Sequence, residues 1–458
     1  MDSQKLFEDF PEVSAKAWKQ KIQYDLKGAD YNDTLVWESP EGINVKPFYH
    51  ADDFSGKSAL APSAPQNWKI GQSIYAGNPI LANEKGVKAV AGGVESIQFT
   101  IPSEDVDFKI LLQQIDVRTI PVYLNMPFLS EQFVKSALVY TSASAPIYFN
   151  VDIVGNLARS GNWYFDHKKD YDLFSKILDS GALHVLQVDI SLYENAGADS
   201  TQQLGYALAH TNDYLHHLSK NGMLEKLKSI HFKVAIGSNY FFEIAKFRAL
   251  RILWKTLAAE YDLDFDCHIT ATPSKRNKTI YDYNVNMLRT TMESMSAILG
   301  GANTIFNMPY DAIYHKDNEF GERIAINQLL LLNNESYFDK VSNPADGAYF
   351  IESITLQLAE KGLQLFKNIE QKGGFLKQLK AHTIQEKIKE SASKQQQRFK
   401  AQEDVLVGSN KFQNETDKMK QQLELHPFVK INPRKTIIEP IIERRLAENL
   451  EKKRLEDE

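Results

Sequence analysis

Residues 229–254 read SIHFKVAIGSNYFFEIAKFRALRILW and contain the patterns of a strand, a turn and a helix in immediate succession. Residues 229–237 form a short apolar run that is typical of a buried strand. Ser238 and Asn239 follow, and both are good helix N-caps. Beyond them, apolar side chains recur at helical spacing at Phe242, Ala245, Ala249, Ile252 and Leu253. The stretch therefore predicts a strand followed directly by a helix, which is the repeating unit of α/β folds.

The same unit recurs on both sides of this stretch. Further strand-like runs lie at 94–101, 121–126, 146–154, 183–190, 265–271 and 303–308, with a weaker one at 346–353. Helical patterns separate them, and this alternation predicts parallel strands in a closed (β/α)8 TIM barrel. An open, doubly wound sheet is the alternative fold. It usually carries a glycine-rich phosphate turn, and neither G-x-G-x-x-G nor G-x-x-x-x-G-K-[ST] occurs in the chain.

The chain divides into three predicted regions. Residues 1–90 combine one amphipathic helix with a stretch interrupted by prolines, so we expect an N-terminal helix and an extended arm. Residues 91–375 carry the alternating strands and helices and form the predicted barrel. Residues 376–458 are helical and strongly charged, with few apolar faces. We expect them to form a C-terminal helical extension that packs on the barrel or on a partner.

The composition excludes several functional classes. The chain has 458 residues and a formal net charge of -6, which argues against nucleic-acid binding. No window approaches the ~18 apolar residues of a membrane span, and the N-terminus lacks the pattern of a secretory signal. Cys267 is the only cysteine, so no internal disulfide can form. We therefore expect a cytoplasmic protein that binds neither nucleic acid nor membranes.

Several segments share their motifs, in order, with one enzyme family. They are SPEGINVKPFYHADDF (39–54), FFEIAKFRALRILW (241–254), NMLRTTMESMSAILGGAN (286–303), the long run from FGERIAINQ to IEQKGG (320–374) and VLVGSNKF (405–412). On these motifs the chain closely resembles the coenzyme B12-dependent acyl-CoA mutases, the methylmalonyl-CoA mutase family. The resemblance covers about residues 35–415.

This resemblance implies a barrel that takes CoA thioesters along its axis and a separate C-terminal domain that holds adenosylcobalamin over the barrel mouth. The family's reaction is a radical rearrangement, methylmalonyl-CoA to succinyl-CoA in the commonest case. Its cobalt-ligating motif D-x-H-x-x-G is matched here only by DCHITA (266–271), which lacks the glycine. Residues 376–458 are too few for a cobalamin domain. We therefore expect no cofactor and no metal on this chain, and adenosylcobalamin on a partner.

The stretch VDISLYENAGA (188–198) departs from the family at a catalytic position. Catalytic chains read I-S-G-Y-H-x-x-E-A-G-A there, and their histidine lies near the substrate carbonyl. Alignment on the shared A-G-A places Leu192 on that histidine and Asn195 on the glutamate. The resemblance therefore implies that the proton-donating side chain is missing.

A second stretch, WKIGQSIYAGN (68–78), departs from the family where catalytic chains clamp the substrate. Trp68 and Ser73 stand where two arginines would lie, and an arginine fork is what binding a carboxylate or phosphate needs. Tyr75 is retained, and we expect it to be a packing remnant rather than a substrate-facing side chain.

No catalytic residue is predicted, and five residues mark a degenerate pocket: Tyr75, Asp189, Leu192, Glu194 and His268. Asp189 and Glu194 flank the altered junction, but no histidine or arginine partner for acid–base catalysis is visible in the sequence. His268 shares a strand face with Asp266. Because no third ligand is apparent, we expect a hydrogen-bonded interior histidine rather than a metal ligand.

Two further expectations concern the barrel and one of its loops. The strands carry bulky side chains at both parities, such as Tyr148 and Phe149, which predicts a barrel filled by its own side chains. Lys275, Arg276 and Lys278 are expected to lie on a solvated loop. Binding of a CoA phosphate by these three residues is the alternative.

The resemblance and these departures together imply a non-catalytic small (beta) subunit that pairs, as a heterodimer, with a larger cobalamin-bearing catalytic subunit of methylmalonyl-CoA mutase. Its role would be assembly. Two alternatives stay open. A standalone acyl-CoA-binding protein would need an open barrel. An active mutase chain that borrows cobalamin from a separate subunit should retain the histidine and the arginines.

Overall fold

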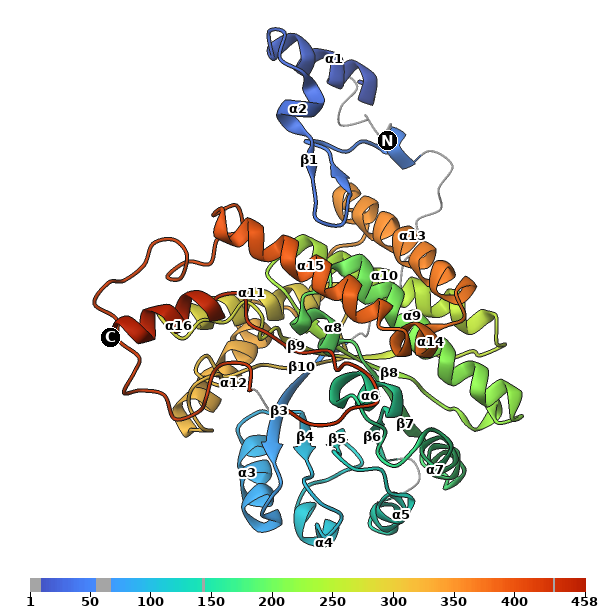
Figure 1. The fold of residues 1–458 in the computed structure, drawn as a ribbon. Helices are drawn as coiled ribbons and strands as arrows, with labels where there is room; N and C mark the ends of the chain where they lie inside the picture. The colour runs from blue at the N-terminus through green and yellow to red at the C-terminus, as the bar shows by residue number, and fades with distance from the viewer. Residues whose placement is uncertain (1–9, 55–66, 142–144, 431–432) are drawn as a thin grey trace, which may run out of the picture.

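A computed structural model of the protein describes residues 10–54, 67–141, 145–430 and 433–458. Eight parallel strands close a barrel in the order β10-β3-β4-β5-β6-β7-β8-β9 (Figure 1). The strands are β3 (Lys69–Tyr75), β4 (Ser96–Thr100), β5 (Val122–Asn125), β6 (Ile147–Val151), β7 (His184–Asp189), β8 (His231–Ile236), β9 (His268–Pro273) and β10 (Thr304–Phe306). The predicted (β/α)8 barrel is confirmed.

One strand of the barrel differs from the prediction. The weak run at 346–353 is not a strand, since it leads into the helix α13 (Tyr349–Gln371). The remaining strand is β3, in a stretch that the sequence assigns to the arm. β3 pairs with both β10 and β4 and thereby closes the barrel. Its Gly71 lies against the ring of Phe306, so a strand with little apolar character is held by close packing of its neighbours.

Helices surround the barrel and bury its outer face. They are α3 (Pro79–Ala91), α4 (Phe108–Leu111), α5 (Glu131–Val139), α6 (Ile153–Ser160), α7 (His167–Asp179), α8 (Ser191–Ala196), α9 (Ser200–Lys220), α10 (Tyr240–Ala259), α11 (Val285–Gly300), α12 (Glu319–Asn334) and α13. α10 begins after Asn239, as predicted. α9 begins with a capping box, in which Asp199 and Gln202 satisfy each other's backbone N–H groups. One apolar cluster joins the strands to these helices.

The N-terminal residues form a small unit that stands away from the barrel in Figure 1. It contains α1 (Ala15–Asp25), α2 (Tyr31–Leu35), the two-stranded hairpin β1 (Trp37–Glu38) and β2 (Asn44–Val45), and the 3-10 helix η1 (Ala51–Phe54). Ile43, next to the hairpin, is buried in the main core. α1 has no buried residue. Residues 1–9 and 55–66 of the predicted arm lie outside the described residues.

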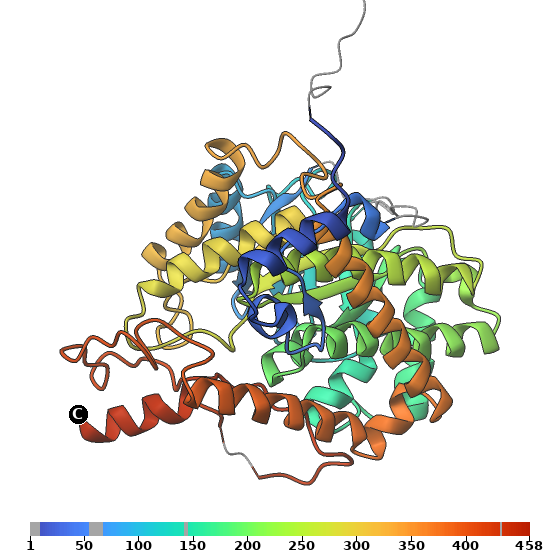
Figure 2. The same cartoon turned by 90° about the horizontal axis from the view of Figure 1, so that it is seen from above.

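The C-terminal residues form α14 (Phe375–Lys380), α15 (Thr383–Lys400) and α16 (Glu448–Asp457), and α15 and α16 follow each other along one side of the molecule (Figure 2). An extended segment, residues 433–447, precedes α16, and we name it the strap. The strap crosses the barrel at the carboxyl ends of its strands (Figure 1). Its backbone N–H groups donate to carbonyls of Ala158, Asn195 and Arg276 at 2.8–3.0 Å.

The boundaries of the three predicted regions stay a prediction. None of the helices in the described part of the chain is both long and apolar enough to cross a membrane.

Candidate functional site

Aromatic side chains fill the axis of the barrel near the amino ends of its strands. We name Tyr123, Tyr148, His231, His268 and Phe306 the plug. The hydroxyl of Tyr123 lies 2.7 Å from His268 Nε2, and the hydroxyl of Tyr148 lies 3.3 Å from His268 Nδ1. The two tyrosine rings stack with centroids 4.6 Å apart. At this level the predicted filled barrel is confirmed, and His268 is the hydrogen-bonded interior histidine that was expected.

The plug is uncharged. Burial, with a smaller contribution from His231, lowers the pKa of His268 well below its usual range. Burial and the nearby Lys233 lower the pKa of His231 to about 3. Burial also raises the pKa of Tyr148 to about 12. Because neither the histidines nor the tyrosine ionise near neutral pH, the plug is a structural hydrogen-bonded core.

A polar layer that shares His231 with the plug continues above it. His231 Nδ1 is 2.8 Å from Asn150 Oδ1, and His231 Nε2 is 2.7 Å from the hydroxyl of Thr270. The Asn150 amide nitrogen donates in turn to Asn125 Oδ1 at 2.8 Å. This chain of bonds assigns the histidine proton to Nδ1, with the Thr270 hydroxyl donating to Nε2. The layer therefore ties β5, β6, β8 and β9 together across the barrel.

Above this layer the barrel opens into a cavity of about 440 Å³, the mouth cavity. Side-chain amides and hydroxyls line it, and among them are those of Gln98, Thr100, Asn125, Asn150, Gln187 and Thr272. Six charged residues also line it: Asp152, Arg159, Asp189, Lys233, Lys275 and Glu443. A cavity at this end of the strands is where barrels of this type hold their ligands.

Five of these six charged residues, all except Asp152, are paired with one another. Arg159 Nη2 lies 2.8 Å from Asp189 Oδ2, and Arg159 Nη1 lies 2.8 Å from Glu443 Oε1. Lys233 Nζ is 3.2 Å from Asp189 Oδ2. Burial alone would raise the pKa of Asp189, but Lys233 and Arg159 hold it below its usual range. Asp189 is therefore ionised at neutral pH and is not available as a proton donor.

Asp152, which also lines the mouth cavity, is hydrogen-bonded to helices outside the barrel strands. It follows β6 and caps α6 through the Gly155 N–H, at 2.8 Å. His210 Nε2 lies 2.9 Å from its Oδ1, and the Tyr214 hydroxyl donates to the same oxygen at 2.7 Å. Asp152, Arg159 and Lys233 were not predicted from the sequence as site residues. Two sequence features could have identified two of them: Asp152 directly follows a strand, and Lys233 lies two residues after His231 and therefore on the same face of β8.

The five predicted pocket residues do not come together. Tyr75 ends β3 on the barrel rim with 61% of its surface exposed, so the expectation that it packs in the interior is wrong. Leu192 is buried within α8. Glu194, also on α8, accepts a hydrogen bond from the Ser274 hydroxyl at 2.6 Å. His268 belongs to the plug, and only Asp189 lines the mouth cavity. The altered junction, residues 188–198, therefore contributes Asp189, Ser191 and Asn195 to the lining of the mouth cavity.

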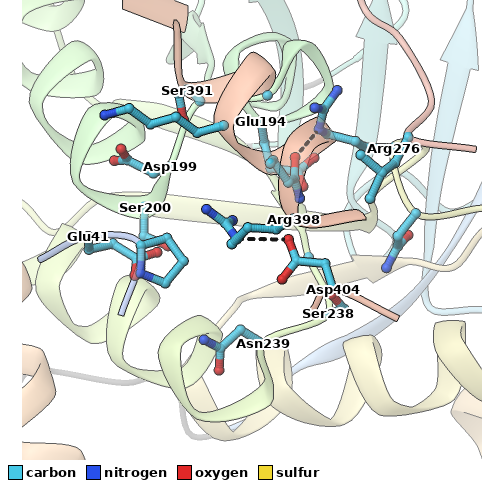
Figure 3. A pocket seen from close by; sticks show the side chains of 18 of the residues that line it. Glu41, Glu194, Asp199, Ser200, Ser238, Asn239, Arg276, Ser391, Arg398 and Asp404 are labelled. Carbon is cyan, nitrogen blue, oxygen red and sulfur yellow. Dashed lines mark hydrogen bonds and ion pairs between the residues drawn. The ribbon is translucent and has the colours of Figure 1, made fainter. Parts of the chain in front are cut away.

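Glu194 lines a separate cavity of about 410 Å³, the side cavity, shown in Figure 3. Its walls come from the start of α9, from α15 and from the N-terminal hairpin. Arg398 Nε donates to Asp404 Oδ2 at 3.1 Å, and Arg276 Nε donates to Gln395 Oε1 at 2.6 Å. Burial raises the pKa of Asp199, on the opposite wall, to about 6.

The loop that carries Lys275, Arg276 and Lys278 was expected to be solvated, and this prediction is wrong for Arg276 and Lys278. Lys278 is buried and lies 2.8 Å from both carboxylate oxygens of Glu293. Arg276 is also buried, and it donates to the Arg444 carbonyl of the strap at 2.8 Å. Lys275 alone is exposed. A strap that packs on the loop is the physical reason, because long-range contacts of this kind have no local sequence pattern.

No group of three or more potential metal-ligating side chains is present among the described residues.

Comparisons with known proteins identify a family and several relatives that this chain resembles. Residues 86–453 match the family model for methylmalonyl-CoA mutase. The chain is 34% identical over 452 residues to the methylmalonyl-CoA mutase small subunit of Porphyromonas gingivalis, covering 91% of this chain and 72% of that one. It is 25% identical over 446 residues to the small subunit of Streptomyces virginiae, covering 90% and 72%.

A longer relative is the methylmalonyl-CoA mutase of Cereibacter sphaeroides, which is 28% identical over 459 residues. The match covers 86% of this chain and 64% of that protein. This chain therefore spans somewhat less than two thirds of the longer relative.

Proposed function

Because the chain belongs to the methylmalonyl-CoA mutase family, we propose that it is the non-catalytic small subunit of a two-chain methylmalonyl-CoA mutase. Its role in that complex is assembly. The partner is a larger chain that binds cobalamin and converts methylmalonyl-CoA to succinyl-CoA. Two relatives that carry the name small subunit support this choice over a one-chain enzyme.

The plug is the observation that carries the proposal. A CoA thioester that enters along the barrel axis needs that axis open, whereas Tyr123, Tyr148 and His268 fill it in this chain and hydrogen-bond one another. Opening the axis would remove these rings from a buried, hydrogen-bonded core, at a cost of several kcal/mol. The plug thus favours a subunit that does not bind substrate.

The mouth supports the same proposal. Leu192 is buried in α8 and provides no proton donor. Asp189, the one predicted pocket residue that lines the mouth, is held by Arg159 and Lys233. A mouth in which Asp189 is held by two cations in this way is suited to a structural role.

The residues present do not fit a bound cobalamin. The strap crosses the face of the barrel on which the family's cofactor domain would lie. His268, in the nearest match to the cobalt-ligating motif, has both ring nitrogens within hydrogen-bond distance of tyrosine hydroxyls inside the barrel. We therefore assign adenosylcobalamin to the partner chain.

A tagged pull-down of this chain from its native cells tests the proposal, with the retained proteins identified and counted by mass spectrometry. We expect a larger mutase chain at one-to-one stoichiometry. The reconstituted pair should show mutase activity with adenosylcobalamin, and this chain alone should show none. Recovery of this chain alone, or only with itself, would contradict the proposal.

Isothermal titration with CoA thioesters separates the remaining alternatives. A filled barrel predicts no binding by the isolated chain at millimolar ligand. Saturable binding there would favour a standalone acyl-CoA-binding protein. Turnover after addition of a small cobalamin-binding protein would favour an active mutase chain.

A further inference from the structure

The mouth cavity carries three cationic and three anionic side chains, and one of the anions does not belong to the barrel. Arg159, Lys233 and Lys275 are the cations. Asp152 and Asp189 are anions that stand on or next to the barrel strands. The third anion, Glu443, comes from the strap, so the chain's own C-terminal segment completes the charge balance of the mouth.

Glu443 is held mainly by two cations. Its Oε1 lies 2.8 Å from Arg159 Nη1, and its Oε2 lies 3.5 Å from Lys275 Nζ. Burial alone would raise the pKa of Glu443, but Lys275 and Arg159 keep it below the usual range. The strap therefore presents an ionised carboxylate to the mouth.

The charge balance restricts what else can enter. With Glu443 in place the six charges cancel, and a further buried anion would lack a counter-charge, which is costly. When Glu443 leaves, the mouth has a net charge of +1 and Arg159 loses one of its two partners. A planar arginine then presents free N–H groups in the geometry that a carboxylate matches.

We propose that the mouth cavity is a binding site for a small free carboxylic acid, whose carboxylate replaces that of Glu443 beside Arg159 and Lys275 and thereby loosens the strap at this residue. The volume of about 440 Å³ suits a small molecule. Amides and hydroxyls such as Gln98, Asn125 and Thr272 line the walls and suit a ligand with further polar groups. The plug closes the cavity below, so the ligand is short.

The strap is attached on both sides of Glu443. The backbone N–H groups of Ile441 and Arg444 donate to Ala158 and Asn195 at 2.8 and 3.0 Å, and Ile441 is buried in the main core. Loss of the Glu443 ion pairs would weaken the strap between these two bonds. Ligand binding and strap position are therefore coupled, since each competes for the same cations.

Isothermal titration of the full chain at constant ionic strength tests the site, with sodium acetate and sodium malonate as probes and acetamide as the neutral control. The variant Glu443→Gln removes the competing charge and should bind the carboxylates about tenfold more tightly than the natural chain. Lys275→Gln should bind them more weakly. Lys275 is largely exposed, so its replacement leaves the fold intact.

Glu439→Gln is the matched control. Glu439 lies on the same strap and pairs with Lys389 on α15, away from the mouth. Its replacement changes the charge of the strap equally and should leave carboxylate binding unchanged. Limited proteolysis should cut the strap faster when malonate is present.

Equal binding by the natural chain and Glu443→Gln would overturn the proposal, and so would equal binding of acetamide and acetate, or no binding in any variant. The isolated chain is used throughout. The result is therefore independent of whether a larger partner chain is recovered.

Discussion

The surroundings of one residue, Leu192, distinguish two interpretations of the altered junction: a lost catalytic site with room for a histidine, or a core packed around leucine. Its side chain is 1% exposed. We predict that Leu192→His lowers the free energy of unfolding by about 3 kcal/mol, because it removes a buried apolar side chain and buries a polar ring without a partner. Urea denaturation measures the change, and the isolated variant should still lack mutase activity.

Leu192→Met is the control for packing alone. It conserves volume and should cost less than about 1.5 kcal/mol. If Leu192→His were as stable as the natural chain, the surroundings of α8 would have to offer the imidazole a hydrogen-bond partner. Activity in that variant would contradict the filled barrel.

The lowered pKa of His231 predicts that the folded barrel loses stability in acid. Its pKa in the folded state is about 3, below the ~6.5 of an unfolded chain. Between these values the unfolded state binds a proton that the folded state excludes. The stabilising contribution is therefore complete above pH ~6.5 and is lost as the pH falls toward 3. His268 acts in the same direction.

Denaturation between pH 7.5 and 5 measures this effect. The natural chain should lose stability on acidification, and His231→Gln should reduce the slope by up to about one proton. His216→Asn, which replaces an exposed histidine on α9, is the control and should leave the slope as it is. The same slope in His231→Gln and the natural chain would refute the assignment.

The sequence allowed the surroundings of some site residues to be predicted but not those of others, because some contacts are local and some depend on the fold. His268 was placed correctly as an interior histidine because its strand pattern is local. Arg276 and Lys278 were expected in solvent, since charged loop residues are usually exposed. Arg444, the partner of Arg276, lies 168 residues away, and Glu293, the partner of Lys278, lies 15 residues away on the next helix, α11. A buried ion pair of this kind is visible only when the fold is known.

At the level of elements, the close packing of the strap on the end of α6 requires a glycine at position 161. Gly161 ends α6 with a φ of +79°, and a Cβ there would lie 2.7 Å from the Ile438 carbonyl oxygen of the strap. We predict that Gly161→Ala destabilises the chain by about 2–3 kcal/mol, partly through the left-handed backbone and partly through displacement of the strap. Denaturation and proteolysis of the strap measure the two parts.

Gly181→Ala separates these two parts. Gly181 has a φ of +90°, and nothing lies within 4 Å of its added Cβ. This variant should lose only the ~1 kcal/mol of backbone strain, with the strap as resistant to protease as in the natural chain. Equal losses in both variants would mean that the strap tolerates a methyl group beneath it.

Elements with strong local patterns were predicted, and the weak ones were not. Seven strands and the helix α10 follow from apolar runs and caps. β3 reads KIGQSIY, in which a glycine and two polar side chains obscure the apolar alternation. Its pairing with β10, more than two hundred residues away, makes it a strand. Tertiary pairing of this kind overrides local propensity.

At the scale of the whole molecule, residues 10–54 of the N-terminal unit form no separate core cluster. α1 has no buried residue, and Val13, Trp18 and Tyr24 expose about half or more of their surfaces. The unit is anchored to the barrel by Ile43 and by the ring contact of Trp37 with Phe242, at 5.9 Å. A helix that projects from the barrel with exposed aromatic side chains is the feature of the proposed subunit that best suits docking to the larger chain.

This projection gives the last prediction. Tyr24 is 79% exposed, so Tyr24→Ala should change the melting temperature of the isolated chain little. If α1 packs on the larger chain, the same change should weaken the complex by tenfold or more, because buried tyrosines carry a large share of interface energy. Tyr140→Ala is the matched control, since Tyr140 is 52% exposed at the end of α5, on the opposite side of the barrel (Figure 1). Titration of both variants with the larger chain decides between docking through α1 and docking through another face. Equal affinities would place the interface elsewhere and leave the exposed Tyr24 of α1 without a role in assembly.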